Sequence, residues 1–313
     1  IRERKQDVVA GNHAEIPMAG FGRMNEIGRC ARAGHGGGDL SGDVAGLTRF
    51  SGEDQAAALA INSAEHYLPL LYTLGARLPG DEVGVFNDTL DGAGGVYLAG
   101  ITQGSTNLAS AGAHQTAFAG ISDQFLAKFN ATTGARLWST YHGGANEDIA
   151  ANVACDPAGN AYLVGETTSP AGIASAGSFQ PAFVADEVYL AKFNSAGVRQ
   201  WSTYFGGPDV EEQPSVACDA NGSVFLSGTT DSDAGIAYNT LHQSFRGGNK
   251  DGFVAKFDGA GNVVWSTYAG GSDTEDLTDV AIDPTGKVVV AGFTQSPDLI
   301  ATTGSFKETI DPA

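Results

Sequence analysis

The sequence has few basic residues and no long apolar run. Only 17 Lys and Arg residues stand against 36 Asp and Glu among 313 residues, so the formal net charge is −19 and the isoelectric point is about 4.4. This charge argues against binding to nucleic acid or to anionic lipid. The apolar runs are shorter than the ~18 residues that a membrane helix needs, so we expect no membrane insertion. A signal peptide is not expected within this chain, because its first residues lack the charged-then-apolar pattern.

Sulfur-containing residues and the motifs of common enzymes are scarce as well. Three cysteines without CxxC spacing argue against a disulfide framework and a zinc site. Phosphate-binding loops in a strand-to-helix setting and nucleophile signatures are missing too. We therefore name no catalytic residue and no cofactor, and an enzymatic activity is the less favoured interpretation.

A repeat is the main feature that the sequence does have. Trp138, Trp201 and Trp265 lie in the strings WSTYHGG, WSTYFGG and WSTYAGG, spaced by 63 and 64 residues. The same period carries a lysine in FLAKF, YLAKF and FVAKF, and a glycine in YLAG, YLVG, FLSG and VVAG. Units of this kind bury their apolar faces against neighbouring copies. We expect the tryptophans to pack between units and the lysines to be structural, paired with a carboxylate, rather than to bind a ligand.

Each unit is predicted to form four short strands. In the second repeat these are residues 149–155, 161–166, 187–193 and 198–204, with DPAGN and NSAG as the turns after the first and third strands. Apolar residues point to both sides of the second and third strands, which indicates a sheet covered on both faces. The prediction is an all-β fold, a β-propeller of four-stranded blades with about four to five repeats.

The combination of motifs resembles a known family. WSTYxGG, an acidic stretch, VAxDxxGN, YLxGxT and DxFxAKF together are similar to the SBBP repeat, named for a presumed seven-bladed β-propeller and common in exported bacterial proteins. The resemblance covers roughly residues 67–306, and the chain departs from the family pattern in holding about four units. It implies a propeller fold and a secreted or cell-surface setting, and it provides no catalytic residues.

The N-terminal part fits the repeat less well. Residues 1–65 are interpreted as a degenerate first repeat or a disordered leader, and residues 66–313 as propeller repeats. If the first repeat is real, strands within residues 55–72 join the strands expected at 276–293, and the termini close the ring together. The alternative is an open arc with an exposed edge.

The connections between strands indicate where a partner binds. Because the strands alternate in direction, the long second-to-third connections and the acidic fourth-to-first connections emerge on one face, which we call the long-loop face. The predicted interaction residues on this face are Glu147, Asp148, Asp209, Glu211, Glu212, Asp273, Glu275 and Asp276. The expected partner is a protein or a polysaccharide. The competing interpretation is a solvated face that keeps the protein in solution.

Calcium is a second interpretation of the acidic residues. Asp231 and Asp233, in the string DSDAG, are the candidate metal ligands, because calcium prefers carboxylate and carbonyl oxygens. The string does not recur in the other repeats, which argues against a structural site in every blade.

Three functions follow as hypotheses. The first is a non-enzymatic interaction module that presents the acidic long-loop face to its partner. The second is a structural spacer within a larger modular protein. The third is a propeller hydrolase or lyase with carboxylates at a central funnel, and it requires a constellation of side chains that does not repeat from blade to blade.

Overall fold

The computed structural model describes residues 94–104, 108–240, 244–307 and 309. The chain divides into two units, 1–64 and 65–313, and every described residue belongs to the second. The predicted first repeat or leader at residues 1–65, and the ring closure through residues 55–72, lie outside the described residues. Within the described part, no helix is long and apolar enough to cross a membrane.

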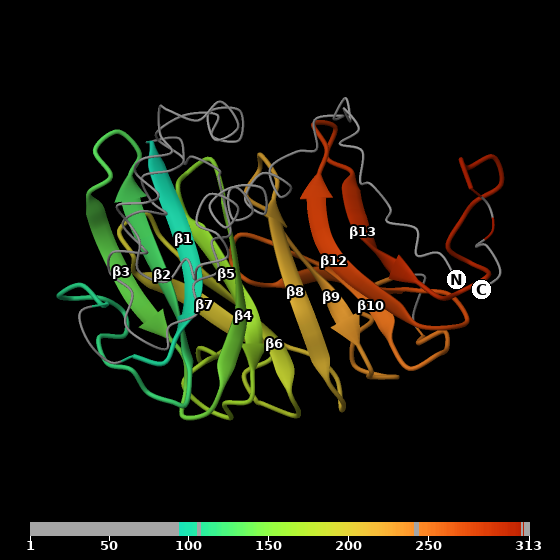
Figure 1. Cartoon of the computed structure of the whole chain (residues 1–313), viewed down its shortest axis with the longest axis horizontal. Coiled ribbons are helices and arrows are strands. Elements are labelled where there is room, and N and C mark those ends of the chain that lie inside the picture. The colour runs from blue at the N-terminus through green and yellow to red at the C-terminus, as the bar shows by residue number, and fades with distance from the viewer. Residues whose placement is uncertain (1–93, 105–107, 241–243, 308, 310–313) are drawn as a thin grey trace, which may run out of the picture. The chain divides into compact units, whose positions relative to one another are not determined.

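The described residues form strands, turns and loops, without a helix, as predicted (Figure 1). The strands make four antiparallel sheets. The first contains β1 (Gly95–Thr102), β2 (Asp123–Asn130) and β3 (Arg136–His142), and the second contains β4 (Asp148–Cys155), β5 (Ala161–Thr167), β6 (Glu187–Phe193) and β7 (Arg199–Phe205). The third contains β8 (Glu211–Cys218), β9 (Val224–Thr230), β10 (Asp251–Phe257) and β11 (Val263–Ala269), and the fourth contains β12 (Glu275–Ile282) and β13 (Val288–Thr294).

The second and third sheets confirm the four-strand unit predicted from the sequence. In each of them, strands that follow one another in the chain are also neighbours in the sheet. The register repeats as well: Lys192 pairs with Trp201 on β6 and β7, and Lys256 pairs with Trp265 on β10 and β11. A register shift follows the lysine in both sheets. The repeated sequence thus specifies a repeated sheet, because apolar side chains and turn residues recur at the same positions.

Successive sheets pack against each other, with β1, β4, β8 and β12 side by side (Figure 1). One core cluster joins the second sheet to the third, since it contains Val164 and Leu190 together with Leu226 and Phe253. Another joins the first sheet to the second through Tyr97 and Tyr189. The second and third sheets are therefore covered on both faces by their neighbours, an arrangement consistent with a β-propeller-like fold.

The recurrent tryptophan and lysine join the first sheet to the second and the second sheet to the third. Trp201 Nε1 donates a hydrogen bond to the carbonyl of Gly259 at 3.2 Å, and Lys192 Nζ donates to the same carbonyl at 2.9 Å. At the preceding junction, Trp138 and Lys128 donate to the carbonyl of Ser195 in the same way. The carboxylate partner predicted for the recurrent lysines is wrong for Lys128 and Lys192, because a turn carbonyl of the next repeat accepts the hydrogen bond of each ammonium.

Candidate functional site

The long-loop face is built where two kinds of connection meet. Backbone hydrogen bonds join the start of the first strand of one sheet to the end of the long connection in the preceding sheet. Asp148 N–H donates to Ser122 at 3.0 Å, Glu211 N–H donates to Asp186 at 2.9 Å, and Glu275 N–H donates to Lys250 at 2.9 Å. The same edge of every sheet therefore carries both the long connections and the acidic ones.

Three of the predicted interaction residues lie inside the protein. Asp148, Glu211 and Glu275 are buried at the first position of β4, β8 and β12. Each accepts a hydrogen bond from the second glycine of the preceding Gly-Gly pair, at 2.7, 3.0 and 2.8 Å respectively. Each also accepts one from the hydroxyl of the last threonine of the neighbouring strand. These carboxylates fix the loops, so their side chains are not available to a partner at the surface.

The other predicted residues reach solvent. Glu147, Asp209 and Asp273 are exposed, and Glu212 and Asp276 are partly exposed. At two of these positions the backbone N–H donates a hydrogen bond to a serine hydroxyl of the following loop. Asp209 N–H donates to Ser232 Oγ at 2.9 Å, and Asp273 N–H donates to Ser296 Oγ at 2.8 Å. The backbone at these exposed carboxylates is therefore fixed while their side chains remain accessible.

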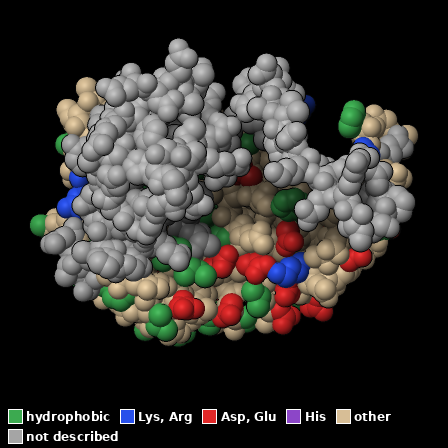
Figure 2. All heavy atoms as spheres, in the orientation of Figure 1, with side chains coloured by type: hydrophobic (Ala, Val, Ile, Leu, Met, Phe, Trp, Pro, Cys, Tyr) green, Lys and Arg blue, Asp and Glu red, His purple; other side chains and the backbone are tan. Residues whose placement is uncertain are grey.

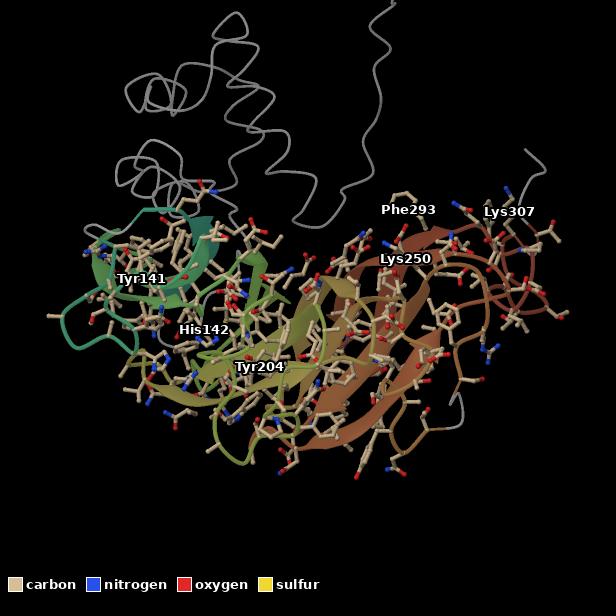
Figure 3. The ribbon with its side chains drawn as sticks, turned by 90° about the horizontal axis from the view of Figure 1, so that it is seen from below. Tyr141, His142, Tyr204, Lys250, Phe293 and Lys307 are labelled. Atoms are coloured by element: carbon tan, nitrogen blue, oxygen red, sulfur yellow. The ribbon has the colours of Figure 1, made fainter. Side chains whose placement is uncertain are left out.

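A charged cluster lies at the ends of the strands of the third sheet. We define the Lys250 cluster as Lys250, Glu212, Asp231, Asp276 and Glu166. Lys250 forms an ion pair with Glu212, and both side chains are about a quarter to a third exposed. The hydrogen bond with Glu212 raises the pKa of Lys250, and the charges of Asp231 and Asp276 raise it further. Lys250 is labelled in Figure 3.

The remaining carboxylates of the cluster are partly desolvated. Burial raises the pKa of Asp231, the charge of Lys250 opposes this, and Glu212 and Asp276 add to the rise. Burial also raises the pKa of Glu166, whose Oε1 accepts a hydrogen bond from the N–H of Gln213 at 2.7 Å. With four carboxyl groups and one ammonium, the cluster attracts cationic groups and accepts hydrogen bonds.

Lys250 and Glu166 depart from the repeat. The residues equivalent to Lys250 are Ser122 and Asp186, and those equivalent to Glu166 are Ile101, Thr229 and Phe293. Neither Lys250 nor Glu166 was predicted from the sequence. The signal that reveals them is this mismatch, because residues that only build the sheet recur in every unit.

The two candidate calcium ligands differ in their burial and in their neighbours. Asp231 is partly buried beside Lys250, whereas Asp233 is exposed and its charge acts on Tyr268. Throughout the described ranges, no group of three His, Cys, Asp or Glu side chains is arranged to hold a metal ion.

Apolar side chains accompany the acidic ones on the long-loop face. Ile121 and Val184 are 60% exposed near the ends of two long connections, and Val210 is 37% exposed beside Asp209. Figure 2 shows Asp and Glu side chains gathered in the lower part of the view, with hydrophobic side chains among them. Such a mixed surface is suited to a partner with both basic and apolar groups.

The comparisons with known proteins agree with the fold. No curated protein matches the chain. Residues 137–170 match the family model SBBP, described as a beta-propeller repeat. The matched segment begins next to Trp138 and includes β4 and β5 with the turn between them. The match at residues 137–170 confirms the resemblance to the SBBP repeat that the sequence motifs indicate.

Proposed function

We propose that this chain is a non-enzymatic interaction module of an exported or cell-surface bacterial protein, and that its long-loop face binds a basic segment of a partner protein. The repeat family favours an interaction module. The net charge of −19 favours a cationic protein over a neutral polysaccharide, because complementary charge speeds and orients association.

The observation that carries this proposal is the Lys250 cluster. It lies on loops and strand ends supported by a rigid stack of sheets, where binding residues commonly occur. Lys250, Glu166 and Asp231 have no counterpart at the equivalent positions of the other repeats, so the stacking of sheets does not require these three side chains. Lys250 places one positive charge among the carboxylates of the acidic surface. A partner with a complementary arrangement of charges recognises this surface.

The experiment uses the full chain and a lysine-rich peptide as the probe, titrated at low and high salt. The test variant, E212Q/D231N/D276N, removes three charges from the Lys250 cluster. The control variant, D219N/D258N/D283N, removes three charges from the short turns. Asparagine is tolerated there, because Asn194 Oδ1 already accepts the turn N–H groups of Ala196 and Val198 at 3.0 Å in an equivalent turn.

The proposal predicts that the test variant loses most of its affinity for the peptide while the control variant keeps it. Equal weakening in both variants means that only the net charge attracts the peptide. Failure of the wild-type chain to bind the peptide supports the spacer hypothesis. Binding of a neutral dextran in place of the peptide supports a polysaccharide partner. Each of these three results contradicts the proposal.

A further inference from the structure

Buried carboxyl groups face each other at the junctions between successive sheets. One partner is the first residue of β2, β6 or β10, and the other is the first residue of the first strand in the next sheet, β4, β8 or β12. The pairs are Asp123 with Asp148, Glu187 with Glu211, and Asp251 with Glu275, and all six residues are at most 2% exposed. Only one member of each pair was expected from the sequence to have a role.

A glycine makes room for each pair. A Cβ atom placed on Gly270 would come under 3.0 Å from Asp251 Oδ1 and from Glu275 Oε2. A Cβ atom placed on Gly206 would similarly meet Glu211 Oε2. These glycines are the first of the Gly-Gly pairs in WSTYFGG and WSTYAGG. The recurrent Gly-Gly string therefore leaves the space in which two carboxyl groups approach each other.

The hydrogen bonds are incomplete at two of the three junctions. Asp123 and Asp148 accept hydrogen bonds on all four of their carboxyl oxygens. By contrast, Glu187 Oε2 and Asp251 Oδ1 are buried without a hydrogen-bond partner. An unpartnered buried carboxylate oxygen is costly, and a proton on it turns the acceptor into a donor.

The surroundings of the Glu187–Glu211 pair favour a proton. Glu187 accepts hydrogen bonds from Gln180 and from the N–H of Val184. Glu211 accepts hydrogen bonds from Gly207, Thr230 and Ser232. The charges that act on the pair are its own and that of Asp231, all of them negative. These neighbours are hydrogen-bond donors, whereas a bound metal ion needs further oxygen ligands.

The Asp251–Glu275 pair has one positive neighbour. Asp251 Oδ2 accepts a hydrogen bond from the N–H of Arg246 at 2.7 Å. The charge of Glu275 raises the pKa of Asp251, and the charge of Arg246 lowers it. Glu275 is held by Gly271 and Thr294.

The pKa directions agree with the geometry. Burial, followed by the charge of Glu211, raises the pKa of Glu187 to about 8. Burial raises the pKa of Glu211 to about 7 and that of Asp251 to about 6.

We propose that the Glu187–Glu211 pair holds a proton, which closes the junction between two sheets in weakly acidic solution and leaves it when the solution becomes alkaline. The hydroxyl formed at Glu187 Oε2 donates a hydrogen bond to Glu211. In alkaline solution the proton passes to hydroxide, and two negative charges then repel each other inside the junction. The chain thus contains a pH-sensitive contact between its repeats.

The sign of the effect follows from linkage. The folded protein binds protons on this pair more tightly than the unfolded chain does, because burial raises the pKa values of Glu187 and Glu211 on folding. Their contribution to stability is fully present below the ordinary glutamate pKa and is lost as the pH rises through the raised value, about 8 for Glu187. The urea midpoint of the full chain should therefore fall between about pH 5 and about pH 9.

The test compares the wild-type chain with Glu187→Gln and Glu147→Gln. The glutamine amide at position 187 donates to Glu211 at every pH, so this variant should lose a clear part of the fall in the urea midpoint. Glu147 is exposed at the end of the acidic connection between β3 and β4, so its variant should follow the wild type. A Glu187→Gln variant with the full wild-type fall, or a wild-type midpoint that does not change with pH, overturns the proposal.

A second measurement does not depend on a variant. Carboxyl ¹³C NMR of the full chain should show a glutamate signal that titrates near the pKa of about 8 given for Glu187. If every glutamate titrates near its ordinary pKa, the pair holds no proton at neutral pH. Calcium or magnesium chloride added in alkaline solution should leave the urea midpoint unchanged. If either salt restores the midpoint to the value found in acidic solution, a metal ion and not a proton closes the junction, and the proposal is wrong.

Discussion

The ammonium of Lys192 lies 5.2 Å from the centroid of the Tyr162 ring and donates a hydrogen bond to the next sheet. The two residues pair across β5 and β6. Lys128 lies over Tyr97 at 5.0 Å, and Lys256 lies over Phe225 at the same distance. A lysine and an aromatic ring within one sheet therefore form one side of a junction that recurs along the chain.

Replacing Lys192 with methionine should destabilise the protein. The substitution keeps most of the apolar side chain and removes both the cation–π contact and the charge-assisted hydrogen bond to Gly259. We expect the free energy of unfolding to fall by about 1–3 kcal/mol, measured by urea denaturation. Lys287→Met at an exposed turn is the control, and we expect it to change the free energy of unfolding by less than about 0.5 kcal/mol. Equal effects of the two substitutions would contradict the role of Lys192.

Replacing Gly261 with alanine should separate steric contact from backbone strain. Gly261 has a φ of 89°, and a Cβ atom there would lie 2.7 Å from the Trp201 ring. Gly286 has a φ of 86° and no atom within 4 Å of its Cβ position. Alanine at residue 286 should cost about 1 kcal/mol from strain alone, and alanine at residue 261 should cost about 1–3 kcal/mol more because the tryptophan must move. Equal midpoints for the two variants in thermal or urea unfolding would show that the contact with Trp201 contributes nothing.

Replacing Thr230 with valine should expose the role of Glu211 inside the protein. The hydroxyl of Thr230 donates to Glu211 Oε1 at 2.6 Å, and both residues are buried. Its loss should lower the free energy of unfolding by about 1–3 kcal/mol and raise the pKa of Glu211 further, because a bond that favours the ionised carboxylate disappears. Thr303→Val, at an exposed position, is the matched control. An unchanged Glu211 titration in the variant, followed by carboxyl NMR, would contradict this prediction.

The strands and the repeat could be predicted from the sequence because both leave periodic signals. The four strands expected in the second repeat are found within one residue at every boundary. Trp201 was expected to pack between sheets, and it does contact the turn at Gly261. These features depend on apolar residues and turn residues, whose positions in the sequence carry the information.

The carboxylates could not be assigned in the same way. A sequence marks Asp148 and Glu211 as charged, and charged side chains are usually exposed. Their burial depends on glycine N–H groups and on threonines of the neighbouring strand, which the sheet brings together. The carbonyl that binds Lys192 leaves no signal at all, because every residue has a carbonyl. Lys250 and Glu166 are visible only when the repeats are aligned and their differences are considered.

Carboxylate footprinting tests the proposed binding surface most directly. The full chain is labelled with a carbodiimide and glycine ethyl ester, with and without the lysine-rich peptide, and the modified residues are identified by mass spectrometry. The account predicts that the peptide protects Glu212, Asp273 and Asp276 from labelling and leaves Asp219, Asp258 and Asp283 at the short turns unchanged. Protection of the short-turn carboxylates, with unchanged labelling of Glu212 and Asp276, would contradict it.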